Sequence, residues 1–508
     1  MLRRTGSRAL FALLPALVVT ACGGDKFPTP LEQAEGDVLT SYEEMMPFLG
    51  DLQERTGAFT LDTIGTSVEG RSLVLLHFTG SGEGAGAGGG DRVTLLMYAQ
   101  QHGNEPSGKE AAIALARDIA TGQFVGFLGS VDLYLIPQVN PDGSEARRRQ
   151  NAAGMDLNRD HLTLTTPEVQ ALHKVFKELM PEAALDVHEY GIAGRAWEEA
   201  GLHKHFGQQI DALTNPNMSE AVRTFALERM IPEMREKLAP RNADLHRYLV
   251  TDGPEARFRH STTALNDGRN SMGIYNTLSY LIEGRNGLTV EDDIRERARE
   301  QLETMKAFIT FAGDHAAEVK ELVARERAAL RGEAAAQEVA LVMDYVADPD
   351  RPTVEVGVVR LETGAVETLT IEAYHPEVET TLSVTRPLGY VVPADLTEVL
   401  AVLERHGIET SPVSGSLQAV VESYRIDSVT EGWKEDKDFL EVGVTVRRRA
   451  TRIPEGAVVV WCDQPATNLI VSLLEPQSQW GLAPLPEFVS MLERGSAYPI
   501  LRIVVVSE

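Results

Sequence analysis

Residues 93–120 read VTLLMYAQQHGNEPSGKEAAIALARDIA, and this stretch indicates how the chain folds. Its first seven residues are nearly all apolar, which predicts a buried strand, and residues 107–121 repeat apolar side chains at helical spacing. A glycine and a proline shape the loop between them. Because strand, loop and amphipathic helix form the repeating unit of α/β proteins, the stretch predicts that fold class. It also places a polar loop at the carboxyl end of a strand, where binding sites collect.

The same alternation continues on both sides of this stretch. It predicts a mixed, mostly parallel sheet with helices on both faces. Residues 84–89 have the G-x-G-x-x-G spacing of dinucleotide-binding turns, but a strand follows them where such a turn needs a helix, so the Gly-rich segment 80–90 is interpreted as a hairpin loop. The expected strands are 59–64, 72–78, 93–99, 131–137, 183–188 and 278–283, and the expected helices are 31–56, 107–121, 167–179 and 290–315.

The composition is that of a globular protein. The chain has 508 residues, of which 43% are hydrophobic and 24% charged, and this excludes a disordered chain. The 75 Asp and Glu outnumber the 48 Lys and Arg, which gives a formal net charge of −27. Phosphate binding requires Lys and Arg, so no nucleic-acid partner is expected. The two cysteines, Cys22 and Cys462, exclude a disulfide framework.

Residues 1–21 have the features of a lipoprotein signal peptide. Arginines precede an apolar stretch that is interrupted by Pro15 and is too short to span a membrane. The sequence Val-Thr-Ala-Cys at 19–22 resembles the lipobox of bacterial lipoproteins, which implies cleavage before Cys22 and acylation of its thiol. We therefore expect an exported protein that is lipid-anchored to the cell envelope, on the periplasmic face or at the outer membrane.

Polar residues stand at the ends of several expected strands. His102 and Glu105 follow one strand, His188 ends a second, and Glu283 ends a third. Because the carboxyl ends of neighbouring parallel strands meet at one edge of a sheet, these side chains are expected to converge. The spacing His-x-x-Glu alone is weak evidence, since on a helix it is often only a surface pair. Its position in a loop after a strand favours a metal site.

Two further motifs complete the pattern. Asn-Pro-Asp-Gly occupies 140–143, and Arg-x-Asn-x-x-Gly-x-Asp-Leu-Asn-Arg occupies 149–159. With the His-x-x-Glu pair, the later His and the Glu that ends a strand, they resemble in order and context the zinc metallocarboxypeptidases of the carboxypeptidase A-like family. Residues 64–71 are also similar to the segment before the first strands of microbial members. The resemblance covers roughly residues 31–313 and implies hydrolysis of the C-terminal bond of a peptide with a free carboxylate.

The resemblance also implies the metal site. It makes His102, Glu105 and His188 the ligands of one Zn²⁺ per catalytic domain, a set that leaves a fourth position open for water. Asp156 matches the residue that orients a ligand histidine. Glu283 matches the general base that takes a proton from the water.

The remaining implied roles concern the substrate. Arg149 matches the arginine that polarises the scissile carbonyl; the two arginines before it compete for the role, and the unbroken motif favours Arg149. Asn158 and Arg159 match the pair that binds the terminal carboxylate of the substrate. The substrate-capping tyrosine of the family has no secure counterpart, and Tyr275 is preferred over Tyr280.

The chain is expected to contain two domains after the signal peptide. Residues 22–316 would form the catalytic domain, and the Ala, Glu and Arg content of the next segment predicts a helical connector at 317–338. Residues 339–508 are rich in Val and Thr with frequent turn signals, which predicts a β-rich accessory domain. Brief helices are expected at 394–406 and near 466–474.

Two other functions stay open. A similar zinc site could serve an amidohydrolase acting on N-acyl amino acids or cell-wall peptides. A non-catalytic binding lipoprotein is the third hypothesis, and the retained ligands together with Glu283 and Arg149 argue against it. His161 is expected to be a solvated loop histidine, and the i, i+2 spacing of His203 and His205 argues against a second metal site.

Overall fold

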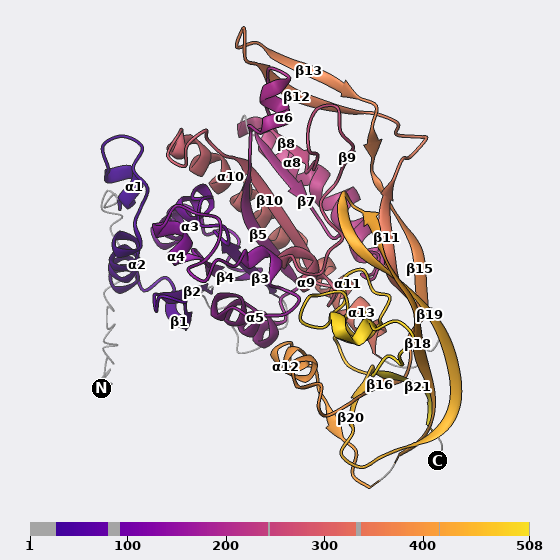
Figure 1. Ribbon diagram of the computed structural model, residues 1–508. Coiled ribbons are helices and arrows are strands. Elements are labelled where there is room, and N and C mark those ends of the chain that lie inside the picture. Colours follow the sequence, from indigo (N-terminus) through magenta and orange to yellow (C-terminus); the bar gives the residue numbers. More distant parts are fainter. Residues whose placement is uncertain (1–26, 80–91, 242–243, 332–336, 416, 507–508) are drawn as a thin grey trace, which may run out of the picture.

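The computed structural model describes residues 27–79, 92–241, 244–331, 337–415 and 417–506. The expected signal peptide, the lipidation site Cys22 and the Gly-rich segment 80–90 lie outside these residues. Within them the predicted fold class is confirmed, because an α/β part with a mixed sheet precedes a β-rich part. Figure 1 shows the α/β part in indigo to pink beside the long strands of the β-rich part in orange to yellow.

The apolar strands build an eight-stranded sheet of order β1-β2-β4-β3-β5-β10-β7-β8. In its middle, β4, β3, β5 and β10 are parallel neighbours. These strands are covered on both faces, so most of their side chains are apolar, and the charged residues of β5 belong to the site described below. The strands are β1 (Thr60–Thr66), β2 (Ser72–Phe78), β3 (Val93–Ala99), β4 (Val131–Ile136), β5 (Ala183–Tyr190), β7 (Gln208–Asp211), β8 (Leu245–Arg247) and β10 (Leu278–Arg285).

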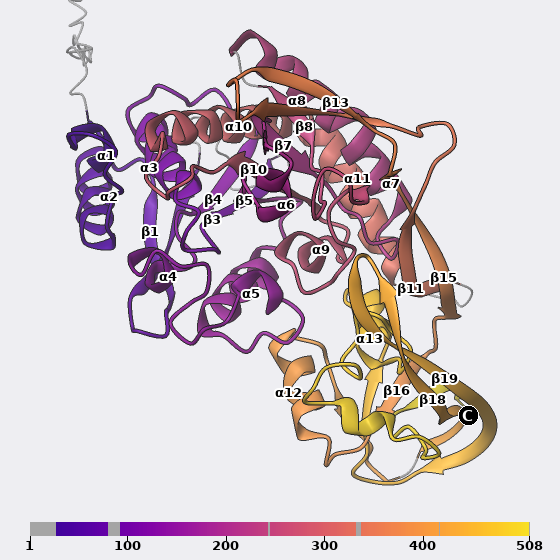
Figure 2. The same ribbon diagram turned by 45° about the horizontal axis from the view of Figure 1, so that its top comes forward.

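Helices cover both faces of this sheet, as predicted. α3 and α10 lie on one face, and α5 and α9 lie on the other (Figures 1 and 2). Gly108 of α3 packs on Val187, whereas Gly268 of α9 packs beside Asp186, and consecutive side chains of β5 point to opposite faces. The helices of this part are α1 (Pro30–Gln33), α2 (Tyr42–Thr56), α3 (Ser107–Ala120), α4 (Pro141–Glu145), α5 (Pro167–Leu179), α6 (Arg195–Glu199), α7 (Glu220–Thr224), α8 (Ile231–Leu238), α9 (Gly268–Gly273), α10 (Ile294–Asp314) and α11 (Ala316–Leu330).

The amino-terminal region differs from the single helix expected over 31–56. α1 ends at Gln33, and Gly36 has a φ of 78°, a left-handed conformation that does not continue a helix. Ser41 then begins α2 with a capping box in which its side chain and that of Glu44 satisfy each other's backbone N–H groups. The expected helix is therefore two helices, and Ser41 with Glu44 mark the start of the second.

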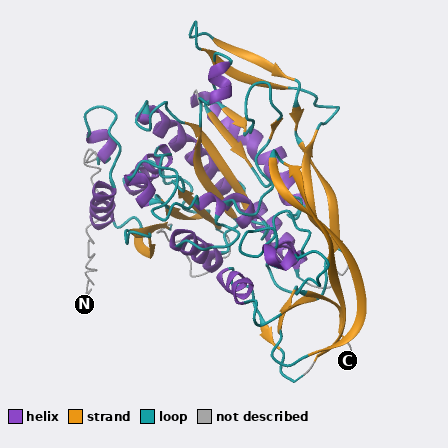
Figure 3. Cartoon of the chain, viewed as in Figure 1, coloured by secondary structure: helices purple, strands orange, loops and turns teal. Residues whose placement is uncertain are grey.

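The β-rich part consists mainly of antiparallel strands, orange in Figure 3. Its six-stranded sheet has the order β17-β20-β16-β21-β18-β19, and β18 (Leu417–Lys434) and β19 (Lys437–Ile453) form a long hairpin. The expected brief helices are α12 (Thr397–Arg405) and α13 (Thr467–Leu474). The other strands after α11 are β11 (Glu338–Val346), β12 (Val354–Arg360), β13 (Val366–Ile371), β14 (Tyr374–His375), β15 (Glu377–Thr385), β16 (Gly389–Val392), β17 (Ser411–Pro412), β20 (Val458–Trp461) and β21 (Leu501–Val506).

The two parts share strands and a hydrophobic core. β12 pairs with β6 (Leu202–Lys204), and β14 pairs with β9 (Phe258–Arg259), so two strands that follow α11 join strands of the α/β part. One hydrophobic core contains buried side chains of both parts, from Met45 in α2 to Ile500 just before β21. Helix α11 lies in the region expected as a connector, and it packs into this core through Val319 and Val323. None of the helices in the described part of the chain is long and apolar enough to cross a membrane.

Candidate metal centre

Three predicted ligands lie together at the carboxyl end of the central sheet. His102 and Glu105 follow β3, and His188 belongs to the adjacent strand β5. Nδ1 of His102 lies 2.8 Å from the Glu105 carboxylate, while Nδ1 of His188 lies 3.0 Å from that carboxylate and 3.1 Å from Nδ1 of His102. All three side chains are buried. In the described part of the chain, no other group of three or more histidine, cysteine or acidic side chains is close enough to hold one metal ion.

The loop that carries the first two ligands is fixed by the Asn-Pro-Asp-Gly motif. A Cβ atom on Gly103 would overlap the backbone of Gly143, so the contact between the two loops requires a glycine. The Asn140 amide donates to the carbonyl of Gln101 at 2.9 Å and accepts from the N–H of Gly143 at 2.9 Å. The motif therefore positions the ligand loop.

Asp142 in the same motif anchors the segment before β2. Its carboxylate accepts hydrogen bonds from the Ser67 hydroxyl at 2.7 Å, from the N–H of Glu69 at 2.9 Å and from the Arg71 guanidinium at 2.6 Å. Residues 64–71, which look like the segment before the first strands of microbial family members, thus brace the loop behind the ligands.

Each ligand histidine has a carboxylate beside its outer nitrogen. Nε2 of His102 lies 3.1 Å from Asp156, and Nε2 of His188 lies 2.9 Å from Asp186. A carboxylate at Nε2 favours the tautomer that carries its proton there and leaves the lone pair on Nδ1. Two Nδ1 lone pairs and a carboxylate then point to one place, which is a donor set that binds a cation. Two histidines and a glutamate fit Zn²⁺.

The charges at this site are strongly coupled. Burial raises the pKa of the Glu105 carboxyl, but His102 and His188 outweigh burial and hold that pKa well below its ordinary value. Burial lowers the pKa of His188, but Asp186 and Glu105 outweigh it and hold that pKa well above its ordinary value. Metal binding therefore competes with protonation of the histidines, and metal affinity is expected to fall in acid.

Glu283 lies beside the ligands because β10 runs parallel to β5 and pairs Glu283 with His188 in register. The residue is buried, with 9% of its surface exposed. Burial raises the pKa of the Glu283 carboxyl to about 8; Glu105 adds to this rise, whereas His188 and Arg149 oppose it. A carboxyl group with a pKa near neutrality can take up and return a proton at working pH.

Tyr248, just after β8, shares the cavity with Glu283. Burial, followed by the charges of Glu283 and Glu105, raises the pKa of the Tyr248 phenol well above its ordinary value. The phenol therefore keeps its proton at neutral pH and can donate a hydrogen bond. Sequence reasoning did not identify this residue, because no motif surrounds it.

Of the three consecutive arginines, only Arg149 reaches the site. Its Nε donates to Asp156 at 2.8 Å, and its Nη1 lies 3.5 Å from Glu105. Arg147 pairs with Glu291. Arg148 donates to a loop carbonyl. The structure thus places the Arg149 guanidinium next to the Glu105 carboxylate.

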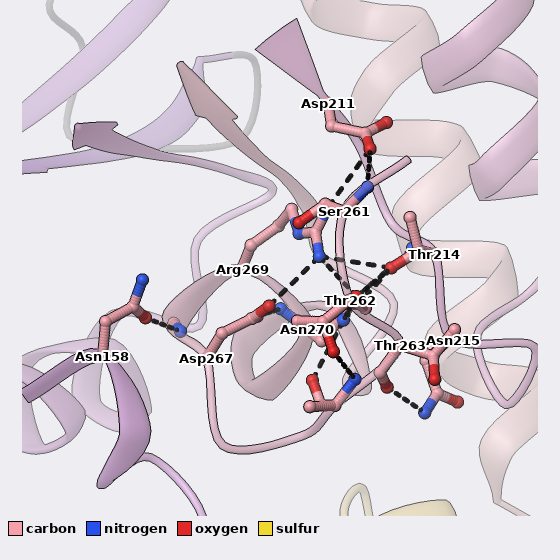
Figure 4. Close-up of polar contacts among 12 residues, drawn as sticks. Asn158, Asp211, Thr214, Asn215, Ser261, Thr262, Thr263, Asp267, Arg269 and Asn270 are labelled. Atoms are coloured by element: carbon pink, nitrogen blue, oxygen red, sulfur yellow. Dashed lines mark hydrogen bonds and ion pairs between the residues drawn. The ribbon is translucent and has the colours of Figure 1, made fainter. Parts of the chain in front are cut away.

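A cavity of about 350 Å³ opens onto these residues. Asn158 and Arg159, which are expected to bind the substrate carboxylate, are among the residues that line it. The Asn158 amide lies 3.2 Å from Nε2 of His188, and its oxygen accepts from the N–H of Gly268 at 2.9 Å, a contact drawn in Figure 4. Arg159 is exposed and donates to the carbonyl of Asn158.

A buried arginine, Arg269, contacts two residues that line the floor of this cavity. Arg269 is fully buried and donates to the carbonyls of Ala212 at 2.9 Å and Thr262 at 2.7 Å, and it pairs with Asp267 at 3.1 Å (Figure 4). Thr262 and Asp267 both line the cavity. Because the guanidinium joins the end of β7 to the loop before α9, this floor is expected to be rigid.

Several predicted residues lie elsewhere. Tyr275 packs against Phe176 in the hydrophobic core and does not line the cavity, so the structure does not bring it to the site. His161 was expected in solvent but is fully buried, where its ring nitrogens contact His173 at 2.9 Å and Gln101 at 2.7 Å. His161 can be buried because Gln101 and His173, which are buried as well, provide partners for both of its ring nitrogens.

Comparisons with known proteins agree with this geometry. The family model for zinc carboxypeptidases matches residues 45–191. Carboxypeptidase 2 of Trichophyton rubrum is 26% identical over 460 residues, which cover 86% of this chain and 81% of the relative. Carboxypeptidase E of Caenorhabditis elegans is 31% identical over 180 residues, which cover 30% of this chain and 37% of the relative.

Among solved structures, a metallo-carboxypeptidase from Burkholderia cenocepacia is 20% identical, with a TM-score of 0.42 and coverage of 54% of this chain and 70% of the other. The family model and the carboxypeptidase relatives agree with the His-Glu-His cluster that the fold assembles. Residues 45–191 therefore correspond to a zinc carboxypeptidase domain, and the comparisons together with the site support a carboxypeptidase A-like metallocarboxypeptidase.

Proposed function

We propose that the metal of this metallocarboxypeptidase is one Zn²⁺ held by His102, Glu105 and His188, and that the substrate is a peptide with a free C-terminal carboxylate. The observation that carries the proposal is the convergence of the two Nδ1 atoms and the carboxylate on one point, with all three ligand atoms within 4.8 Å of one another. When bound, Zn²⁺ would supply Lewis-acid polarisation of a water molecule and of the scissile carbonyl.

The protein groups then have distinct roles. Glu283 takes a proton from the attacking water and delivers it to the leaving amine nitrogen, a task that suits a carboxyl with a raised pKa. The Arg149 guanidinium stabilises negative charge that develops on the carbonyl oxygen. Asn158 and Arg159 bind the terminal carboxylate, and Tyr248 donates a hydrogen bond within the cavity.

The decisive experiment replaces Glu283 with Gln. Turnover of a C-terminally free peptide should fall by about 10³-fold or more, while zinc content measured by atomic absorption stays at one per chain. Glu300→Gln on α10 is the matched control, since it makes the same substitution outside the cavity and should leave turnover unchanged. An active Glu283→Gln protein would refute the role of Glu283.

The substrate class is tested with modified termini. Peptides whose C-terminal carboxylate is amidated should resist hydrolysis, because Arg159 and Asn158 then lack their anion. A panel of N-acyl amino acids and cell-wall peptides tests the amidohydrolase alternative. Faster turnover of either panel than of linear peptides would favour that alternative.

We also propose that a lipid on Cys22 anchors the protein to the cell envelope. The lipobox-like sequence at 19–22 supports this proposal. Cys22→Ala should shift the protein from the membrane fraction to the soluble fraction, and mass spectrometry should show loss of the acylated amino-terminal peptide. Equal distribution of both proteins would contradict the anchor.

A further inference from the structure

The tip of the β18–β19 hairpin forms part of the wall of the catalytic cavity. Figures 1 and 2 show that this hairpin of the β-rich part reaches back toward α9 and β7 of the α/β part. Glu435, Asp436 and Lys437 line the same cavity as His102 and Glu283. Residues of both the α/β part and the β-rich part therefore line the cavity.

The turn at this tip is held in a demanding conformation. Glu435 and Asp436 have φ values of 49° and 61°, in the left-handed region where two-residue hairpin turns favour Asn and Gly. Non-glycine residues remain there when surrounding contacts fix them. Glu435 is fully buried and accepts from the Thr262 hydroxyl at 2.9 Å and from the N–H of Thr263 at 3.1 Å.

Asp436 fixes the tip from its other side. Its carboxylate pairs with Arg257 at 3.0 Å and with Arg259 at 2.9 Å. Both arginines belong to the α/β part: Arg259 ends β9, and Arg257 directly precedes that strand. The tip is therefore held by hydrogen bonds and ion pairs, and the next residue, Lys437, is exposed and lines the cavity.

The nearby acidic groups are already satisfied by other donors. The charges that act on the Lys437 ammonium are those of Arg159, Arg259, Glu435 and Asp267. Glu435 is bonded by the two threonines, and Asp267 caps α9 and pairs with Arg269. Within the described residues, no side chain or carbonyl accepts a hydrogen bond from Lys437 and no carboxylate pairs with it.

Arg159 is in a similar state. Its guanidinium donates to the carbonyl of Asn158, and no carboxylate among the described residues pairs with it. Burial, and then the positive charges of Arg159 and Arg259, lower the pKa of Lys437. Lys437 and Arg159 thus line one cavity and repel each other, and within the described part of the chain neither forms an ion pair with a carboxylate. Two negative groups on one ligand would remove this repulsion.

We propose that Lys437 is a specificity residue that binds an acidic side chain on the C-terminal residue of the substrate while Arg159 binds its α-carboxylate. This inference rests on the proposed function and names its substrate class, peptides that end in Glu or Asp. The β-rich part thereby supplies the selectivity of a site whose metal ligands lie in the α/β part.

The test measures kcat/KM for peptides that differ only in a C-terminal Glu, Gln or Leu. The wild-type protein should prefer Glu, and Lys437→Met should lower kcat/KM for the Glu peptide about 10- to 100-fold, the range for a charge-assisted hydrogen bond, with less than a twofold change for Leu. Lys437→Arg should retain the preference. An equal loss for all three peptides would overturn the proposal, as would no loss at all.

The matched control is Lys434→Met. Lys434 faces Lys437 in the register of the same hairpin but lines a different cavity with Trp433 and Phe439. This change removes one positive charge from the same hairpin and should leave the Glu preference intact. If the Lys434→Met protein lost the preference for the Glu peptide, net charge rather than Lys437 would set that preference.

A binding experiment separates this inference from the proposed function. Calorimetry with Glu283→Gln protein measures the affinity for intact Glu-, Gln- and Leu-terminated peptides without hydrolysis. If no peptide is hydrolysed by the wild type but the Glu peptide binds most tightly and loses this advantage in Lys437→Met/Glu283→Gln, the subsite stands and the proposed reaction fails. Equal affinity for the three peptides overturns the subsite, whatever the wild type hydrolyses.

Discussion

His406 should make the protein sensitive to acid. It lies at the end of α12, where the β-rich part contacts the α/β part, and its Nε2–H donates to the carbonyl of Leu162 at 2.8 Å. Its Nδ1 is buried without a hydrogen-bond partner among the described residues. Protonation would place an unpaired N–H in the interior, which is unfavourable. Replacement by Gln keeps a donor near Leu162 and removes the titratable ring.

The magnitude follows from the shift in pKa. Burial, reinforced by the charges of Lys177 and Arg405, lowers the pKa of His406 from 6.5 to about 4. Between these values the unfolded chain binds more protons than the folded chain, so the free energy of unfolding falls as pH falls. The stabilisation is complete above about pH 6.5 and is lost as pH falls through 4. At about 1.4 kcal/mol per pH unit, it amounts to about 3 kcal/mol.

The assay is urea unfolding of wild type and His406→Gln at pH 7.5, 6.5, 5.5 and 4.5. Between pH 7.5 and pH 4.5, the unfolding free energy of His406→Gln relative to that of wild type should rise by about 2–3 kcal/mol. His246→Gln, a change at a more exposed histidine beside Asp244, is the control and should follow wild type. Parallel pH curves for wild type and His406→Gln would refute the reasoning.

The other predictions concern the metal centre. Asp156→Asn and Asp186→Asn should each weaken zinc binding about 10- to 100-fold, because each carboxylate lies beside the outer nitrogen of a histidine that is proposed to bind the metal; competition with a chelator measures this, and unchanged affinity would contradict the role. Arg149→Met should lower kcat about 10²- to 10³-fold with zinc content unchanged, whereas Arg147→Met should match wild type. Equal loss in both arginine variants would point to a general effect of charge.

Much of the α/β part could be predicted because its signals are local. Apolar runs mark the strands, and the sheet then brings their carboxyl ends together, so His102, Glu105, His188 and Glu283 meet as expected. A contact between Asp186 and a polar partner could also have been predicted, since a carboxylate inside a fully buried strand requires one.

The rest of the site depends on contacts that have no local signal. Tyr248 and Lys437 reach the cavity only through the packing of distant segments. Tyr275 lies close to Glu283 in sequence, but the chain turns through α9 and buries its ring against Phe176. Proximity in sequence therefore favoured a tyrosine that does not line the cavity, whereas the strand-end motifs predicted side chains that the fold brings together.

The hydrogen bonds between Thr263 and Glu435 join positions 172 residues apart. During synthesis, the three residues proposed to bind the metal leave the ribosome long before the β18–β19 hairpin does. Closing so long a loop is slow. A chain that stops after α11 would contain the three ligands and Glu283 yet lack one side of the substrate cavity. The wall of the cavity is therefore completed last, and carboxyl-terminal truncation is expected to change which peptides are recognised as well as how stable the fold is.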